Sequence, residues 1–148
     1  MVNRKDWKWF GNAGHLCVGR WCRFHLCTQV GNYLVSTVGQ YWPERPAREV
    51  HAQVHDPKWL AKHGILRGDN FDAKYLEHFG YEDIGCDRKF ETMVFKTTGK
   101  ICSEKSCDCG MPLVADWGEL DADAYNDAGS ATQGHMKMCK KWAKKEAE

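Results

Sequence analysis

The stretch WCRFHLCTQVGNYLVSTVGQY, residues 21–41, decides the fold. Its two parts, residues 21–29 and 33–41, are rich in the aromatic and β-branched residues that are typical of strands. Between them, Gly31-Asn32 supplies the residue types of a short hairpin turn. The stretch therefore predicts two antiparallel strands joined by a tight turn, on which the rest of a sheet is expected to build.

Three other segments have strand character. Residues 15–18 are expected to precede the hairpin as a further strand, and residues 89–97 alternate with the period of two that a strand requires. Residues 49–55 alternate in the same way, with apolar side chains on one face and polar side chains on the other. Together these segments predict an antiparallel sheet of about four strands.

Helices are expected between and after the strands. Asp56-Pro57 combines a capping carboxylate with a proline at the first helical position, and residues 71–79 carry an aromatic stripe at helical spacing. The last helix is the clearest, because Ser130-Ala131-Thr132-Gln133 fits a capping box. Its expected inward stripe consists of Ala131, His135, Met138, Cys139 and Trp142. Its outer face and last turns carry Lys137, Lys140, Lys141, Lys144 and Lys145, where lysines also suit the helix dipole.

The composition sets the expected compartment and argues against several functions. Seven tryptophans, six phenylalanines and five tyrosines argue for a folded chain. A net charge of +1 provides no global field that would attract nucleic acid. The one feature in favour of nucleic-acid binding is the presence of lysines at both ends of the chain, near Trp7, Trp9, Phe10 and Trp142. No apolar run approaches the roughly 20 residues that span a bilayer. The charged first residues are not followed by an apolar segment, so we expect no secretory signal and a cytoplasmic location.

In a reducing cytoplasm, eight cysteines favour metal binding over disulfides. Five candidate ligands compete for four positions in the last third of the chain: Cys102, Cys107, Cys109, His135 and Cys139. His135 and Cys139 are four residues apart on one helix face, and Gly110 lets the backbone turn its N–H groups toward the sulfur of Cys109. Thiolates plus one imidazole are typical of a closed structural zinc site.

We therefore expect one structural zinc ion that staples the C-terminal helix to the preceding loop. Which cysteine is the spare stays open, because the spacing is not that of a common zinc knuckle. In the alternative interpretation, His135 and Cys139 belong to an ordinary core. The fold class that follows is α+β: residues 1–148 form one zinc-stabilised domain with an antiparallel sheet and helices packed on one side of it.

The N-terminal part offers a second set of metal ligands. It consists of His15, Cys17, Cys22, His25 and Cys27. His25 and Cys27 share a strand face, and a turn brings Cys17 or Cys22 alongside them. The spacing matches no common zinc pattern, and cysteines are often buried as small apolar residues. A second zinc ion and a set of core thiols are thus both compatible with this pattern.

A catalytic interpretation rests on polar residues of the predicted strands. These residues are Arg23, His25, Ser36, Thr37 and Glu91. On adjacent strands they would form a cleft floor suited to a nucleotide-like substrate; otherwise they decorate the solvated face of the sheet. The sequence contains no phosphate-binding glycine loop, no nucleophile elbow and no deaminase zinc signature.

Five stretches carry a resemblance to a known group of proteins: GNAGH at 11–15, CRFHLCT at 22–28, YLVSTVG at 33–39, ETMVF at 91–95 and GH at 134–135. With them the chain resembles small Cys/His-rich proteins of uncharacterised function that are encoded by tailed phages of actinobacteria. The resemblance implies a setting in the host cytoplasm and no catalytic residue. We expect a non-catalytic protein that binds a host macromolecule, a host protein rather than nucleic acid. The alternatives are a small enzyme that acts on a nucleotide or nucleic acid, and a structural virion component.

Overall fold

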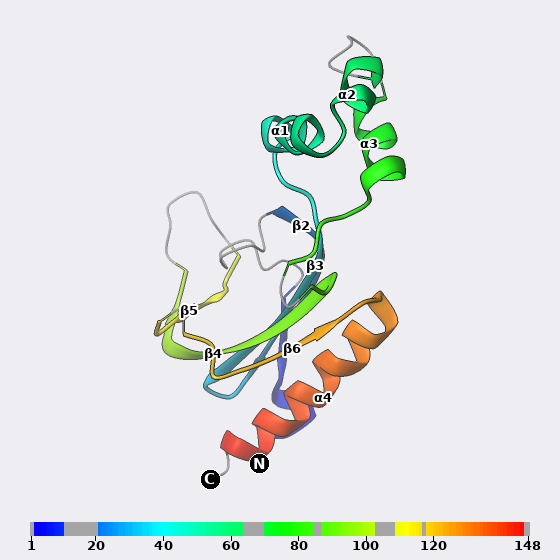
Figure 1. Ribbon diagram of the computed structural model, residues 1–148. Helices are drawn as coiled ribbons and strands as arrows, with labels where there is room; N and C mark the ends of the chain where they lie inside the picture. Colours follow the sequence, from blue (N-terminus) through cyan, green and yellow to red (C-terminus); the bar gives the residue numbers. More distant parts are fainter. Residues whose placement is uncertain are drawn as a thin grey trace.

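The computed structural model describes residues 2–10, 21–63, 70–84, 87–102, 109–116 and 118–146, and it confirms an α+β fold with an antiparallel sheet (Figure 1). The strands are β1 (Lys8–Phe10), β2 (Cys22–Val30), β3 (Tyr33–Tyr41), β4 (Phe90–Ile101), β5 (Pro112–Val114) and β6 (Asp121–Tyr125). The helices are α1 (Arg45–His55), α2 (Pro57–His63), α3 (Phe71–Phe79) and α4 (Ala128–Glu146), and a 3-10 turn, η1 (Arg4–Asp6), precedes β1.

The sheet is larger than expected. Its described strands run in the order β1-β2-β3-β4-β5, and β6 also pairs with β4. The first part of β4 pairs with β6 and its last part pairs with β5. The sequence did not predict β1, β5 or β6, because strands of three to five residues are too short to show a period. The strand expected at 15–18 lies outside the described residues.

The hairpin of residues 21–41 is confirmed. Val30 and Tyr33 pair directly, and Gly31 has a φ of 60°, a left-handed value that glycine adopts without strain at a tight turn. The strand β3 then pairs with β4, so that Val35 lies opposite Val94. Three long antiparallel strands in this register form the centre of the sheet.

The strand expected at residues 49–55 is wrong, because this segment belongs to helix α1. Pro46 stands in its first turn, where a helix tolerates proline. Arg48 and Ala52, one helical turn apart, are its buried residues, whereas Val50 and Val54 are 64% and 70% exposed. A stretch of seven alternating residues fits the period of two of a strand and the period of 3.6 of a helix almost equally well. Packing against α3 favours the helix.

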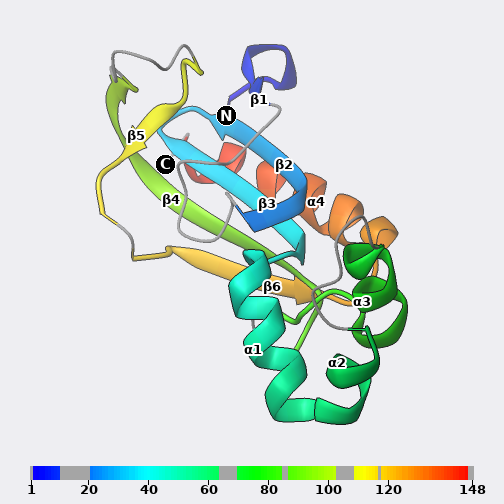
Figure 2. The same cartoon turned by 90° about the horizontal axis from the view of Figure 1, so that it is seen from above.

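Helices α1, α2 and α3 form a separate small cluster beyond one end of the sheet (Figures 1 and 2). Its core consists of Ala52, Phe71 and Tyr75, with Trp42 and Trp59 packed against it. The helix start at Asp56-Pro57 is confirmed, since Asp56 Oδ1 accepts the Trp59 N–H at 3.0 Å. The bounds predicted for the second helix, 71–79, are those of α3.

Arg48 holds this helical cluster together. Its side chain is only 5% exposed, and its guanidinium donates to Asp72 Oδ1 at 2.5 Å and to the Pro43 carbonyl at 3.0 Å. The same group lies 4.2 Å from the centre of the Trp42 ring. A buried arginine needs such partners, since an unpaired charge away from water is costly.

Helix α4 packs across one face of the sheet, where it contacts β2, β3, β4 and β6. The expected inward stripe is confirmed, because His135 and Cys139 are fully buried and Met138 is nearly so. The expected capping box is wrong by three residues: Asp127 caps the helix by accepting the Ser130 N–H at 2.8 Å. None of the helices in the described ranges is long and apolar enough to cross a membrane.

Candidate functional site

His135 is the centre of a buried polar network between α4 and the sheet. Its Nε2 lies 2.8 Å from the Thr28 hydroxyl and its Nδ1 lies 2.8 Å from the Thr37 hydroxyl, which in turn lies 2.6 Å from the Thr92 hydroxyl. Burial lowers the pKa of His135 to about 4. The imidazole is therefore neutral at pH 7, with one ring nitrogen donating and the other accepting.

Cys139 lies one turn further along α4 in an apolar cluster with Val35 and Val94. Burial raises the pKa of its thiol to about 12, so the group is not a thiolate at neutral pH. Cys109 packs instead against a second cluster, which contains Leu34. Because Leu34 and Val35 are neighbours on one strand, these two clusters lie on opposite faces of the sheet.

The structure thus separates the four expected zinc ligands that it describes into two pairs. His135 and Cys139 lie on the face of α4 that packs against the sheet, whereas Cys102 and Cys109 lie at the β4–β5 end of the sheet. Cys107 lies outside the described residues. Among the residues that are described, no three histidine, cysteine or acidic side chains are arranged to hold a metal ion. What holds α4 against the sheet here is apolar packing together with the threonine contacts of His135.

The turn that follows Cys109 has the geometry expected from the sequence. Gly110 has a φ of 65°, and the N–H of Met111 donates to Cys109 Sγ at 3.5 Å. Met111 also accepts the Cys102 N–H at 2.8 Å, which ties both cysteines to one hairpin. Backbone N–H groups directed at sulfur stabilise a thiolate.

The N-terminal ligand set is only partly described, because His15 and Cys17 lie outside the described residues. Burial, assisted by Glu91, raises the pKa of Cys22 to about 12, and burial, assisted by Cys139, does the same for Cys27. His25 Nε2 lies 2.6 Å from the backbone oxygen of Cys22 and therefore donates to it. Cys22 and Cys27 thus lie in the apolar cluster that contains Leu34, and His25 contacts the first residue of its own strand.

The catalytic set proposed from sequence is divided. Thr37 belongs to the His135 network, and Ser36 is 4% exposed on the other face of β3. Arg23 lies 4.6 Å from the centre of the Trp42 ring, toward the helical cluster. His25 and Glu91 remain in line across the sheet, since each pairs with Val38, from β2 and β4 respectively.

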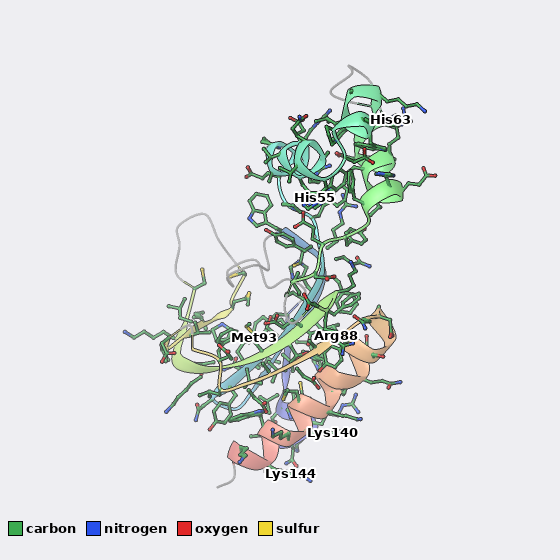
Figure 3. The ribbon with its side chains drawn as sticks, in the orientation of Figure 1. His55, His63, Arg88, Met93, Lys140 and Lys144 are labelled. Carbon is green, nitrogen blue, oxygen red and sulfur yellow. The ribbon has the colours of Figure 1, made fainter. Side chains whose placement is uncertain are left out.

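Glu91 borders a hollow of about 410 Å³ on the face of β4 and β6 opposite α4; Figure 3 labels two of its lining residues, Arg88 and Met93. Burial and the charge of nearby Glu119 raise the pKa of Glu91. The hollow is lined by Arg88, Glu91, Met93, Glu119, Ala122, Asp123 and Ala124. Sequence reasoning found Glu91 but not Glu119, because only the β4–β6 pairing brings them together.

The outward surface of α4 carries five exposed lysines around a depression of about 430 Å³. We call this surface the lysine face; its members are Lys137, Lys140, Lys141, Lys144 and Lys145. Figure 3 labels Lys140 and Lys144 on the helix.

Only one of these lysines has an acidic partner in the described part of the chain: Lys141 Nζ lies 2.6 Å from Asp121 Oδ2. Partial burial would raise the pKa of Asp121, but hydrogen bonds from Lys141 and Trp142 hold it below its usual value. None of the other four lysines forms an ion pair with a described carboxylate, although Lys137 borders a depression that also contains Asp121 and Asp123. Most of the positive charge of the lysine face is thus available to a partner.

The N-terminal segment places two further cations, Arg4 and Lys5, near the C-terminal end of α4. The Val2 N–H donates to the Ala143 carbonyl at 3.2 Å, and the Trp7 ring packs in the cluster that contains Ala143. Arg4 and Lys5 lie between these two anchors and are exposed. Their contribution was not predictable from sequence, because it depends on a contact between opposite ends of the chain.

Comparison with known proteins adds no identity: no protein-family model, curated protein or solved structure matches this chain. The geometry alone defines an α+β protein with a neutral buried histidine, an acidic hollow and a basic helix surface.

Proposed function

We propose that this protein is a non-catalytic binding protein that holds an acidic macromolecule against its lysine face. The observation that carries the proposal is the set of four exposed lysines on α4 that have no carboxylate partner in the described ranges. The whole chain has a net charge of only +1, so the positive charge of this surface is balanced by acidic residues elsewhere in the chain. In the setting that the phage resemblance implies, the partner would be a host macromolecule.

The intrinsic stability of α4 does not account for this arrangement. Lysines three or four residues apart on a helix repel each other, at about 0.2–0.5 kcal/mol for a pair. Lys144 and Lys145 lie in the last turn, where the helix dipole favours a cation. Lys137 and Lys140 lie further back, beyond the reach of that effect. An acidic partner would offset the repulsion and so gives these positions a role.

The test is binding to two defined acidic probes, poly-glutamate and a random-sequence DNA duplex, measured by fluorescence anisotropy. A variant with Lys137→Glu, Lys140→Glu and Lys144→Glu is expected to bind at least tenfold more weakly than the natural chain. The control reverses three exposed lysines outside α4, Lys58, Lys62 and Lys100, and is expected to keep full binding. Equal binding by the α4 variant and the natural chain, or no binding of either probe, would refute the proposal.

We also propose that the zinc ion expected from the cysteine content binds at the β4–β5 end of the sheet. Support comes from Cys109, whose sulfur already accepts a backbone N–H, and from Cys102 on the same hairpin. Cys107, between them in sequence, lies outside the described residues. His135 is not proposed as a ligand, because both of its ring nitrogens are occupied by threonine hydroxyls.

Elemental analysis of protein purified without added metal tests this placement. The natural chain and a Cys139→Ser variant are expected to retain one zinc ion per chain, and a Cys102→Ser, Cys109→Ser double variant is expected to retain none. Loss of zinc from the Cys139 variant would return the site to α4. A natural chain without zinc would remove the proposal.

An enzyme that acts on a nucleotide is the second candidate function, and the hollow beside Glu91 is the observation that favours it. A carboxyl group whose pKa is raised by burial and by a neighbouring carboxylate can serve as a proton donor. Substitution of Glu91 by glutamine should abolish turnover and leave the unfolding temperature unchanged. Turnover that survives this substitution would exclude Glu91 from the reaction.

A further inference from the structure

We infer that the acidic partner is double-stranded nucleic acid, held through its phosphate backbone. This inference rests on the proposed function and specifies the partner of the lysine face. The whole-chain charge, which at the sequence level favoured a protein partner, does not describe this surface. Locally the lysine face, Arg4 and Lys5 place seven cations along α4 and the segment beside it, of which Lys141 is already paired with Asp121.

The chemistry of the lysine face fits phosphates better than a protein surface. Protein interfaces are built around buried aromatic, apolar and arginine side chains, and lysine is depleted in them. The apolar side chains of α4 point into the core, and Trp142 is tied to Asp121 by a hydrogen bond of 3.0 Å. The outward surface therefore offers a protein partner little apolar area to bury, whereas lysine ammonium groups can still bind phosphates as point charges.

The length of the lysine face matches a duplex backbone. Lys137 and Lys145 are eight residues apart, which corresponds to about 12 Å along a helix. One strand of a duplex carries a phosphate for about every 3.4 Å of axis. A helix laid along the groove edge would thus face three or four phosphates on one strand. Arg4 and Lys5, at the C-terminal end of α4, extend the contact to further phosphates.

The lysine face also lacks the features that read sequence or hold single strands. Helix α4 contains no arginine or asparagine, and its one glutamine, Gln133, precedes the lysine face by one turn, so only the lysines themselves could reach base edges there. Single-strand binding relies on aromatic side chains that stack on bases. Among the described residues, Trp9 on β1 is a largely exposed tryptophan, but its ring contacts those of His135 and Trp7, with centres 6.1 Å and 6.3 Å apart. Binding is therefore expected to be independent of sequence and stronger for duplexes.

The experiment measures the affinity of the full chain for a 20-base-pair random duplex as a function of salt concentration. With about five phosphate contacts, the logarithm of the association constant should fall with a slope of about −4.5 against log salt. That slope corresponds to an affinity loss of about 500-fold between 50 and 200 mM salt. A variant with Lys137→Ala, Lys140→Ala and Lys144→Ala should show a slope of about −2, since each lysine accounts for about one contact.

Three controls make the outcomes distinct. A variant with Lys58, Lys62 and Lys100 replaced by alanine should keep the natural slope, and poly-glutamate at equal charge should not displace the duplex. Poly-glutamate that binds as tightly as the duplex, through the same lysines, would overturn this inference and leave the proposed function standing. Tighter binding of single strands that is lost in a Trp9→Ala variant would overturn it as well. The absence of any lysine-dependent binding would overturn both.

Discussion

Lowering the pH should destabilise this protein through His135, in addition to the loss from carboxylates whose pKa is held low, such as Asp121. The imidazole is neutral in the folded state, where burial lowers its pKa to about 4 from the ordinary histidine value of 6.5. In the unfolded chain it takes up a proton below pH 6.5, so protonation favours unfolding. Each unit of difference corresponds to 1.36 kcal/mol, and the folded state should lose about 3 kcal/mol as the pH falls from above 6.5 through 4.

Urea unfolding at several pH values between 7 and 4.5 measures this loss. The natural chain is compared with a His135→Gln variant, whose amide does not titrate and still reaches one threonine hydroxyl. The free energy of unfolding of the natural chain should fall by about 2.5 kcal/mol more than that of the variant by pH 4.5. An exposed-site control, His55→Gln, should follow the natural chain.

Parallel curves for the natural chain and the His135→Gln variant would refute this account of the buried histidine. If a chelator abolishes the difference between the natural chain and the variant, this account is also refuted, because His135 then binds a metal ion. The experiment therefore also decides between the threonine network and the zinc staple that the sequence predicted.

Three further substitutions test the packing that positions these sites. Thr37→Val removes the hydroxyl group that links the His135 ring to Thr92, so two buried polar groups lose a hydrogen-bond partner. The free energy of unfolding, measured in urea, should therefore fall by about 2 kcal/mol. Gly134→Ala should lower the melting temperature, because the added Cβ would lie 2.1 Å from the Tyr125 hydroxyl oxygen. This clash should outweigh the better helix propensity of alanine. An unchanged melting curve would show that the Tyr125 side chain moves aside. Arg48→Lys should destabilise the α1–α3 cluster by about 1–3 kcal/mol, followed by near-ultraviolet circular dichroism, because lysine cannot reproduce the planar contacts of the guanidinium.

Local patterns predicted the long elements because each has its own signal. The hairpin of 21–41 combines strand-forming residues with a glycine turn, and α3 was predicted with its observed bounds. The stripe of His135 and Cys139 was predicted to face inward, and it does. The segment 49–55 failed because seven residues do not separate a strand period from a helical one, and the contacts of Arg48 with α3 are distant in sequence.

The partners of the site residues were not predictable in the same way. A histidine and a cysteine four residues apart on a helix fit a zinc site and a buried core equally well. Only the sheet register, which places Thr28 and Thr37 under His135, identifies the ring as satisfied by hydroxyl groups. The hollow beside Glu91 likewise depends on the pairing of β4 with β6.

The sequence by itself determined the α+β class, the central hairpin and the periodic lysines of α4, because turn chemistry and side-chain period act over a few residues. The tertiary structure alone decided that Arg4 and Lys5 join those lysines, that His135 pairs with threonines and that Cys109 lies on the other face of the sheet from Cys139. These outcomes depend on contacts between segments that are far apart in sequence, such as Val2 with Ala143 and Thr28 with His135. The free energy of such contacts is set by the register and the burial of the whole sheet.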